Sequence, residues 1–309
     1  MSGQEEVGGA GTDGTRHATV QEPTVYGTDL LRTSVRPVPR DRGWEWTRTT
    51  GPLAPVAFQP LTGLGDRLAA VGREGSVRLA VGRTEGPGRV YAVGGQESVA
   101  NRLLSDGPLP VLHKPLHGLG LALAGLHADG PPPGTEPLGP PRGLVRLDTW
   151  LSGRAPVARA AYVGAQLQRR LGPERWARVT GWCRDVTEDT DVTLVHGAPG
   201  IGSLVVESDT GQASLLSGED LAVAPWYFDL GWVLGELVEL RWQLGGDRQG
   251  WQVLLEALFE GYGRDAGEEW NRMAVLRILL HVHDIAAYVG WHTAGFDHYT
   301  TFLIFLIDL

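Results

Sequence analysis

Side chains that can transfer protons or bind a metal gather in two stretches of this 309-residue chain. The first stretch, residues 194–237, contains seven candidate residues of the histidine, serine, carboxylate and tryptophan types. These are His196, Ser203, Ser217, Glu219, Asp220, Trp226 and Asp229. Histidine and carboxylate side chains act as general acids or bases when a substrate lies within hydrogen-bond reach. This stretch is therefore the first candidate for a functional site.

A second group of candidates lies in the segment LLHVHDIAAY. His281 and Asp284 are three residues apart and would share one helix face, and His283 adjoins Asp284. Two interpretations remain open: an acid–base or metal half-site, or a polar notch in a core helix that bonds to a neighbouring loop. No ligand spacing typical of zinc is present, so we expect no metal here.

The order of residues in 194–237 resembles the catalytic segment of aminoglycoside phosphotransferase-type kinases. That pattern runs His-Gly-Asp, four residues, Asn, a strand, a turn with Gly, a strand ending in Ile-Asp, a loop and Asp-Leu. His196 and Gly197 match its start, and Asp229 matches its last Asp. The resemblance covers residues 115–290. It implies an α+β, protein-kinase-like bilobal fold with a reduced N-terminal β-lobe and a mainly helical C-lobe, in which His196 and Asp229 tie the catalytic loop to a helix.

Three positions depart from the family pattern. Ala198 stands in place of the catalytic Asp, Ser203 replaces the metal-binding Asn, and Ser217 replaces the second metal-binding Asp. Phosphoryl transfer depends on a carboxylate that orients the attacking hydroxyl and on Mg²⁺ held by oxygen ligands. We therefore expect a degenerate catalytic loop without nucleotide or metal cofactor. Glu219 and Asp220 leave two alternatives open: relocated metal ligands, or a solvated acidic loop.

The chain has a single lysine, Lys114. Kinases hold the nucleotide phosphates with a lysine on the third strand of the N-lobe. Residues 76–81 and 89–93 alternate in polarity and are interpreted as a hairpin that supplies this strand. It ends at Gly94, so the resemblance implies that the phosphate-binding lysine is missing.

The sequence divides into three regions. Residues 1–22 are expected to be a disordered N-terminus, residues 23–105 a reduced N-lobe, and residues 106–309 the helical C-lobe with the degenerate catalytic loop. Apolar residues at helical spacing predict the main helices of this C-lobe. They are expected over residues 116–127, 156–171, 174–183, 228–242, 252–263 and 268–289.

Composition narrows the classes of partner. The formal net charge of −9 argues against nucleic acid and against an anionic membrane surface. Cys183 is the single cysteine, so neither an internal disulfide nor a thiolate zinc site can form. The N-terminus has no apolar core typical of a signal peptide, and no apolar run has the length of a membrane span. We expect a cytoplasmic protein.

Three functions follow from these patterns. The first is a pseudokinase of ribosomal-peptide biosynthesis, resembling the phosphotransferase-like proteins of thioamitide and class V lanthipeptide pathways. It would bind a dehydrated precursor peptide and promote thioether ring closure, a lyase-type cyclase reaction, with His196, or His283 and Asp284, as acid–base groups. Ser203, Ser217, Glu219, Asp220, Trp226 and Asp229 would line the substrate cleft. The second is a non-enzymatic scaffold for a partner biosynthetic enzyme, and the third is a small-molecule kinase that uses Glu219 or Asp220.

Overall fold

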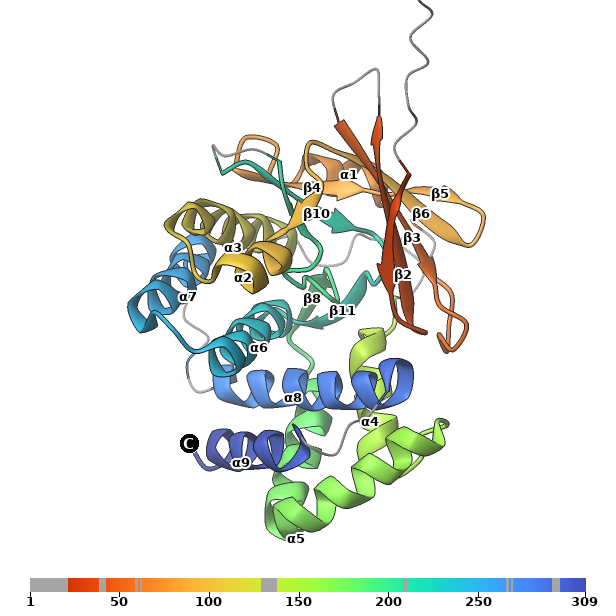
Figure 1. The fold of residues 1–309 in the computed structure, drawn as a ribbon, viewed down its shortest axis with the longest axis vertical. Coiled ribbons are helices and arrows are strands. Elements are labelled where there is room, and N and C mark those ends of the chain that lie inside the picture. Colours follow the sequence, from red (N-terminus) through yellow and green to blue (C-terminus); the bar gives the residue numbers. More distant parts are fainter. Residues whose placement is uncertain are drawn as a thin grey trace, which may run out of the picture.

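The computed structural model describes residues 22–38, 43–58, 61, 63–128, 138–207, 211–264, 267, 269–290 and 295–309. A lobe of twisted strands lies against a larger helical lobe (Figure 1). This arrangement confirms the expected α+β bilobal fold. Residues 1–21 of the N-terminal segment expected to be disordered lie outside the described residues.

The first sheet has five antiparallel strands in the order β1-β2-β3-β6-β5. Their bounds are β1 Thr24–Gly27, β2 Leu31–Val38, β3 Gly43–Thr50, β5 Arg83–Glu85 and β6 Gly88–Val93. Alternate residues of a strand face the same side of a sheet, which places Trp46 and Arg48 of β3 together on the buried side. Trp46 packs there with Tyr91 and Val93 of β6.

A second sheet connects this lobe to the helical part of the chain. It has the order β4-β10-β9-β7, with β4 Val77–Val81, β10 Ala213–Ser217, β9 Leu204–Val206 and β7 Glu97–Ser98. β4 and β10 run parallel, with Leu79 opposite Leu215. Two strands from the first third of the chain therefore pair with the two strands that follow the catalytic loop.

We expected residues 76–81 and 89–93 to pair as a hairpin, and this prediction is wrong for the first strand. The partner of β6 is the short strand β5, whereas β4 leaves for the second sheet. The change of sheet occurs at Gly82, whose amide donates to the carbonyl of Ser217. A Cβ at this position would lie 2.6 Å from the Tyr91 ring, so a glycine suits the crossing. Period-2 alternation identified both segments as strands but carries no information on which strand each one pairs with.

The third sheet is the antiparallel pair β8 Val192–Val195 and β11 Ala222–Pro225. The described residues also contain eleven helical segments. They are α1 Gly65–Ala70, α2 Val99–Asp106, the short 3-10 turn Pro110–Leu112, α3 His113–His127, α4 Arg142–Leu151, α5 Ala158–Glu188, α6 Tyr227–Leu244, α7 Arg248–Tyr262, α8 Glu269–Asp284, its continuation Ile285–Val289, and α9 Phe296–Ile307.

Most helices agree with the periodicity of the sequence. The expected segments 116–127, 228–242, 252–263 and 268–289 lie within α3, α6, α7 and α8 with its continuation. The two segments expected at 156–171 and 174–183 form α5, which breaks at Gly172, a residue with φ of 80°, before Pro173 starts the second half. The sequence patterns did not indicate α4 or α9.

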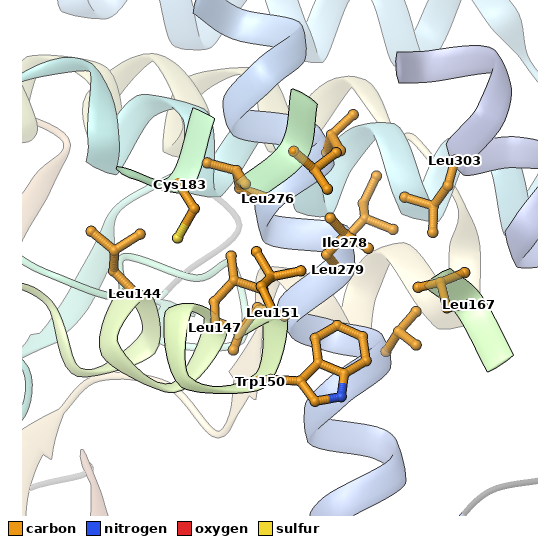
Figure 2. Packing of buried hydrophobic residues seen from close by; sticks show 14 of the residues in the cluster. Leu144, Leu147, Trp150, Leu151, Leu167, Cys183, Leu276, Ile278, Leu279 and Leu303 are labelled. Carbon is orange, nitrogen blue, oxygen red and sulfur yellow. The ribbon is translucent and has the colours of Figure 1, made fainter. Parts of the chain in front are cut away.

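The largest core of the helical lobe forms where α4, α5, α8 and α9 meet (Figure 2). Trp150 of α4 is buried in this core and donates its indole N–H to the carbonyl of Ala160 across a distance of 2.7 Å. Cys183 is buried in this core, and burial raises the pKa of its thiol to about 12. A buried thiol of this kind is inert, so Cys183 is a packing residue.

In the described residues, no helix combines the length and the apolar character that crossing a membrane requires.

Candidate functional site

Asp229, in the first turn of α6, fixes the loop that follows β8. Its side chain is fully buried, and its two carboxylate oxygens accept the backbone N–H groups of His196, at 2.6 Å, and Gly197, at 3.0 Å. Gly197 has a φ of 85°, a conformation that glycine adopts without strain. The expected tie between this loop and the helix beneath it is therefore present, with Asp229 in a structural position.

A buried chain of polar groups supports Asp229 from behind. His127, the last residue of α3, places its Nε2 at 3.0 Å from the Asp229 carboxylate and its Nδ1 at 2.9 Å from the Tyr262 hydroxyl. Burial, with a contribution from the Asp229 charge, raises the pKa of Tyr262 to about 12. Thr193 completes the chain by donating to the His127 carbonyl. Local sequence patterns did not indicate these contacts of His127, because its partners Asp229 and Tyr262 lie more than 100 residues away.

His196 also serves the backbone. Its ring is buried, with Nε2 at 3.0 Å from the Leu216 carbonyl of β10 and Nδ1 at 3.4 Å from the Ala198 amide. Nε2 donates to the carbonyl, and Nδ1 accepts from the amide. Both ring nitrogens are thus occupied by main-chain groups, and the ring connects the loop to the second sheet.

The far side of the loop is held by an ion pair that the sequence did not indicate. Glu236 of α6 accepts the N–H of Ile201 at 2.7 Å and pairs with Arg277 of α8 at 2.5 Å. A Cβ at Gly200 would lie 2.8 Å from a Glu236 oxygen, so the loop approaches this carboxylate closely. The loop is therefore anchored from both ends, by Asp229 and by Glu236.

Arg48 of β3 occupies the space between the first sheet and this loop. Its guanidinium lies 3.0 Å from Ser203 Oγ, 3.3 Å from the Gly202 carbonyl and 3.4 Å from Glu219 Oε2. Tyr91 of β6 donates its hydroxyl to the other Glu219 oxygen at 2.6 Å. Both side chains of the Arg48–Glu219 ion pair are only 8% exposed. Four residues from three separate parts of the sequence thus form one buried polar group, called here the Arg48 cluster: Arg48, Tyr91, Ser203 and Glu219.

The ionisable groups of the Arg48 cluster favour each other's observed protonation states. Burial alone would lower the pKa of Arg48, but Glu219 and Tyr91 more than offset that effect and raise it. Burial is also the main cause that raises the pKa of Tyr91, and the Glu219 carboxylate raises it further. Both effects keep Arg48 charged and the Tyr91 hydroxyl protonated, so each donates to Glu219. Glu219 is therefore a buried ion-pair partner rather than part of a solvated acidic loop.

The inward-facing cation of the first sheet lies on β3 and is Arg48. Gly94 follows β6, and the absence of a phosphate-binding lysine there stays a prediction. Residues 23–60 were expected as irregular structure or short edge strands, and the structure forms β1, β2 and β3 there.

The remaining expected site residues fall into separate environments. Ser217 is fully buried and donates to the Leu215 carbonyl. Asp220 pairs with Arg142 of α4 beside a cavity of about 70 Å³, room for a few water molecules, that Glu219 and Arg146 also line. Trp226 stacks on Tyr262, with the Arg264 guanidinium 4.1 Å from the centre of its ring. The structure therefore groups Ser203 with Glu219 but does not assemble all these residues into one open cleft.

His283 and Asp284 form part of a different polar group inside the helical lobe. His283 Nδ1 lies 2.8 Å from Asp284, whose carboxylate pairs with Arg146 of α4 at 3.0 Å. His281 does not pair with Asp284, since its Nδ1 lies 2.6 Å from Glu239. Of the two interpretations left open by the sequence, the polar notch in a core helix describes this geometry, although the partners are helices and not a loop.

The Asp284 pair predicts a pH dependence of stability. Burial by itself would raise the pKa of Asp284, but Arg146 and His283 outweigh it, so the folded-state pKa lies below the ordinary value. A carboxyl with a depressed folded pKa stabilises the fold above its unfolded pKa, and this contribution is lost as the pH falls through the folded value. We expect urea unfolding to show a smaller loss of stability below about pH 4 in Asp284→Asn than in the wild type. The exposed Asp185→Asn should keep the wild-type profile, and an Asp284→Asn profile parallel to wild type would contradict the assignment.

The residues present do not fit a Mg²⁺-nucleotide. Ala198 has no oxygen, and Ser203 and Ser217 offer neutral hydroxyls that are already hydrogen bonded. The two nearby carboxylates, Glu219 and Asp220, are each paired with an arginine. Within the described ranges, no group of three or more histidine, cysteine or carboxylate side chains could hold a metal ion.

Comparison with known proteins identifies the fold of this chain. No family model and no curated protein sequence matches the chain. Among solved structures, an amicoumacin kinase in complex with AMP-PNP and Ca²⁺ is 11% identical over 93% of this chain and 88% of its own, with a TM-score of 0.59. The Plasmodium vivax ethanolamine kinase is 12% identical over 96% and 84%, with a TM-score of 0.52. An aminoglycoside phosphotransferase from Streptomyces rimosus is 17% identical over 84% and 92%, with a TM-score of 0.50.

The chain has the fold of small-molecule phosphotransferases. The machinery of phosphoryl transfer comprises a strand cation, a catalytic carboxylate, and metal ligands from an Asn and an Asp. The sequence resemblance places Ala198, Ser203 and Ser217 at the last three of these positions, in the loop after β8 and at the end of β10.

Proposed function

We propose that this protein is a pseudokinase that acts by binding a partner and not by transferring a phosphoryl group. The observation that carries the proposal is the Arg48 cluster. Ser203, which stands in place of a metal-binding Asn, accepts from Arg48, and Glu219, a carboxylate that could serve as a relocated metal ligand, is paired with the same arginine. Metal binding by these two residues would require this buried ion pair to separate.

The absence of a general base supports the same proposal. In kinases, a catalytic-loop carboxylate accepts the proton of the attacking hydroxyl. At this position the chain has Ala198, whose methyl group accepts no proton. His196 cannot take over without giving up its bonds to the Leu216 carbonyl and the Ala198 amide. Asp229 of α6, the carboxylate that contacts the loop, is occupied by two backbone amides and His127.

Within the pseudokinase proposal, we favour the scaffold over ring closure. Thioether formation by a cyclase needs an acid–base group that reaches a dehydrated peptide. His196 and His283 are 4% and 3% exposed, and each ring is held by internal contacts. A scaffold needs only a stable surface. Its partner would be a biosynthetic enzyme of a peptide-modifying pathway, or the precursor peptide which that enzyme modifies.

The proposal predicts that the protein does not bind Mg·ATP. Isothermal titration calorimetry with ATP and Mg²⁺ should give no binding heat, and addition of both should leave the melting temperature unchanged. Glu219→Gln is the matched variant, because it removes the one carboxylate inside the Arg48 cluster. Neither the wild type nor this variant should bind Mg·ATP.

Tight Mg·ATP binding by the wild type, lost in Glu219→Gln, would overturn the proposal in favour of a small-molecule kinase with a relocated metal ligand. The two pseudokinase roles are separated by incubation with a dehydrated, cysteine-containing peptide. A scaffold should leave the rate of free-thiol loss unchanged. Acceleration that disappears in a His283→Gln variant would favour the cyclase.

A further inference from the structure

A pocket outside the Arg48 cluster is lined by residues of α6, α7, α8 and α9. It has a volume of about 560 Å³. α9 lies at the end of the helical lobe that is far from the five-stranded sheet, so this pocket opens on a different part of the molecule (Figure 1). Small-molecule sites commonly measure about 300 to 1,000 Å³. The pocket is therefore large enough for a ligand of its own.

Its walls are mainly apolar and aromatic. Trp242 of α6, Phe259 of α7, Trp270 of α8 and Phe302 and Phe305 of α9 all line it. Phe305 is 60% exposed and extends the aromatic lining to the surface. Burial of such rings against the apolar part of a ligand is favourable by roughly 25 cal/mol per Å². The walls thus favour a ligand with an apolar body.

The polar groups of the pocket favour an anionic head on that ligand. Arg241 of α6 lines the pocket, is half-buried, and has no hydrogen-bond or ion-pair partner for its guanidinium among the described residues. The one carboxylate side chain in the lining, Glu256, is exposed and accepts a hydrogen bond from Gln252 at 3.0 Å. A partly buried guanidinium without a partner gains most from a carboxylate, which can accept two parallel N–H bonds from its planar fork.

We propose that this pocket binds a small amphipathic acid, with its apolar chain against the aromatic walls and its carboxylate on Arg241. Glu256 competes weakly as a site for a cationic head, because it is exposed and its charge is screened by the surrounding water. The pocket is independent of the Arg48 cluster, so this proposal stands whether or not the protein binds a nucleotide.

The test uses dodecanoate, dodecanol and dodecylamine as probes, which share one apolar chain and differ in the head. Each is titrated by calorimetry into the full-length protein below its micelle concentration, with Trp fluorescence as a second readout. Dodecanoate should bind with a stoichiometry of one and more tightly than the other two. Arg241→Gln should weaken dodecanoate roughly tenfold or more and leave dodecanol unchanged, since a hydrogen bond to a charged group is lost.

Two further variants serve as controls for the location of the binding site. Arg248→Gln removes an exposed arginine of α7 outside the pocket and should bind dodecanoate like the wild type. Leu255→Trp fills the pocket and should abolish binding of all three probes, with circular dichroism confirming that the variant is folded. Equal affinities for dodecanoate and dodecanol, or an Arg241→Gln variant that binds as the wild type does, would overturn the proposal. So would size-exclusion chromatography showing a dimer that Phe305→Ser dissociates, since a second copy would then cover the pocket.

Discussion

Replacement of Asp229 by alanine is expected to lower the free energy of unfolding by about 3 to 5 kcal/mol. The carboxylate accepts the amides of His196 and Gly197 and the ring of His127, and all of these groups are buried. Alanine leaves every one of these donors without an acceptor. Urea denaturation followed by circular dichroism measures the effect.

Asp229→Asn gives a graded comparison. Its single amide oxygen can serve fewer donors, and its NH₂ group would face N–H groups, so we expect a loss between that of Asp229→Ala and zero. The control is Asp185→Asn on the exposed face of α5, which should change stability by no more than about 0.5 kcal/mol. A loss of similar size in Asp229→Ala and the control would mean that the loop is held by something other than this carboxylate.

The second large effect concerns the Arg48 cluster. Arg48→Met is expected to cost about 3 to 5 kcal/mol, because it leaves the Glu219 carboxylate buried with only the Tyr91 hydroxyl as a donor. Arg48→Met combined with Glu219→Gln should recover most of that loss. The double variant removes both charges, and Tyr91 can still donate to the Gln oxygen. Chemical denaturation of the four proteins in this cycle gives the coupling energy of the pair.

The same cycle tests whether the ion pair stabilises the fold at all. Arg48 Nε is buried without a hydrogen-bond partner in the described structure, so the charge of Arg48 is only partly compensated. The double variant is therefore expected within about 1 kcal/mol of the wild type. Arg32→Met on β2, an exposed arginine of the same sheet, is the control. If Arg48→Met were as mild as this control, the pair would not exist in solution.

The sequence predicted the parts of the fold that depend on local patterns. The frame from His196 to Asp229 and the periodic helices α3, α6, α7 and α8 could be identified, because their signals lie within one contiguous segment. Residues that meet from distant segments could not be identified in this way. Arg48 acts with Glu219 across 171 residues, and His127 acts with Asp229 across 102.

The candidate site was predicted less well than the fold, for a physical reason. Residue type shows what a side chain can do, whereas its partners decide what it does. His196, His283 and Asp284 have the chemistry of acid–base groups, but their donors and acceptors are used by main-chain carbonyls, amides and neighbouring ions. Residues 23–60 were expected as irregular structure or short edge strands, which could not show that Arg48 faces inward from β3.

The parallel pairing of β4 with β10 has a mechanical consequence. Five aligned residue pairs, from Val77–Ala213 to Val81–Ser217, bind the N-terminal lobe to the strand that follows the catalytic loop. Rotation of one lobe away from the other would have to break these main-chain bonds together, which makes a wide hinge motion costly. A partner would therefore meet a surface already in its bound shape, and little of the binding free energy would be lost to rearrangement.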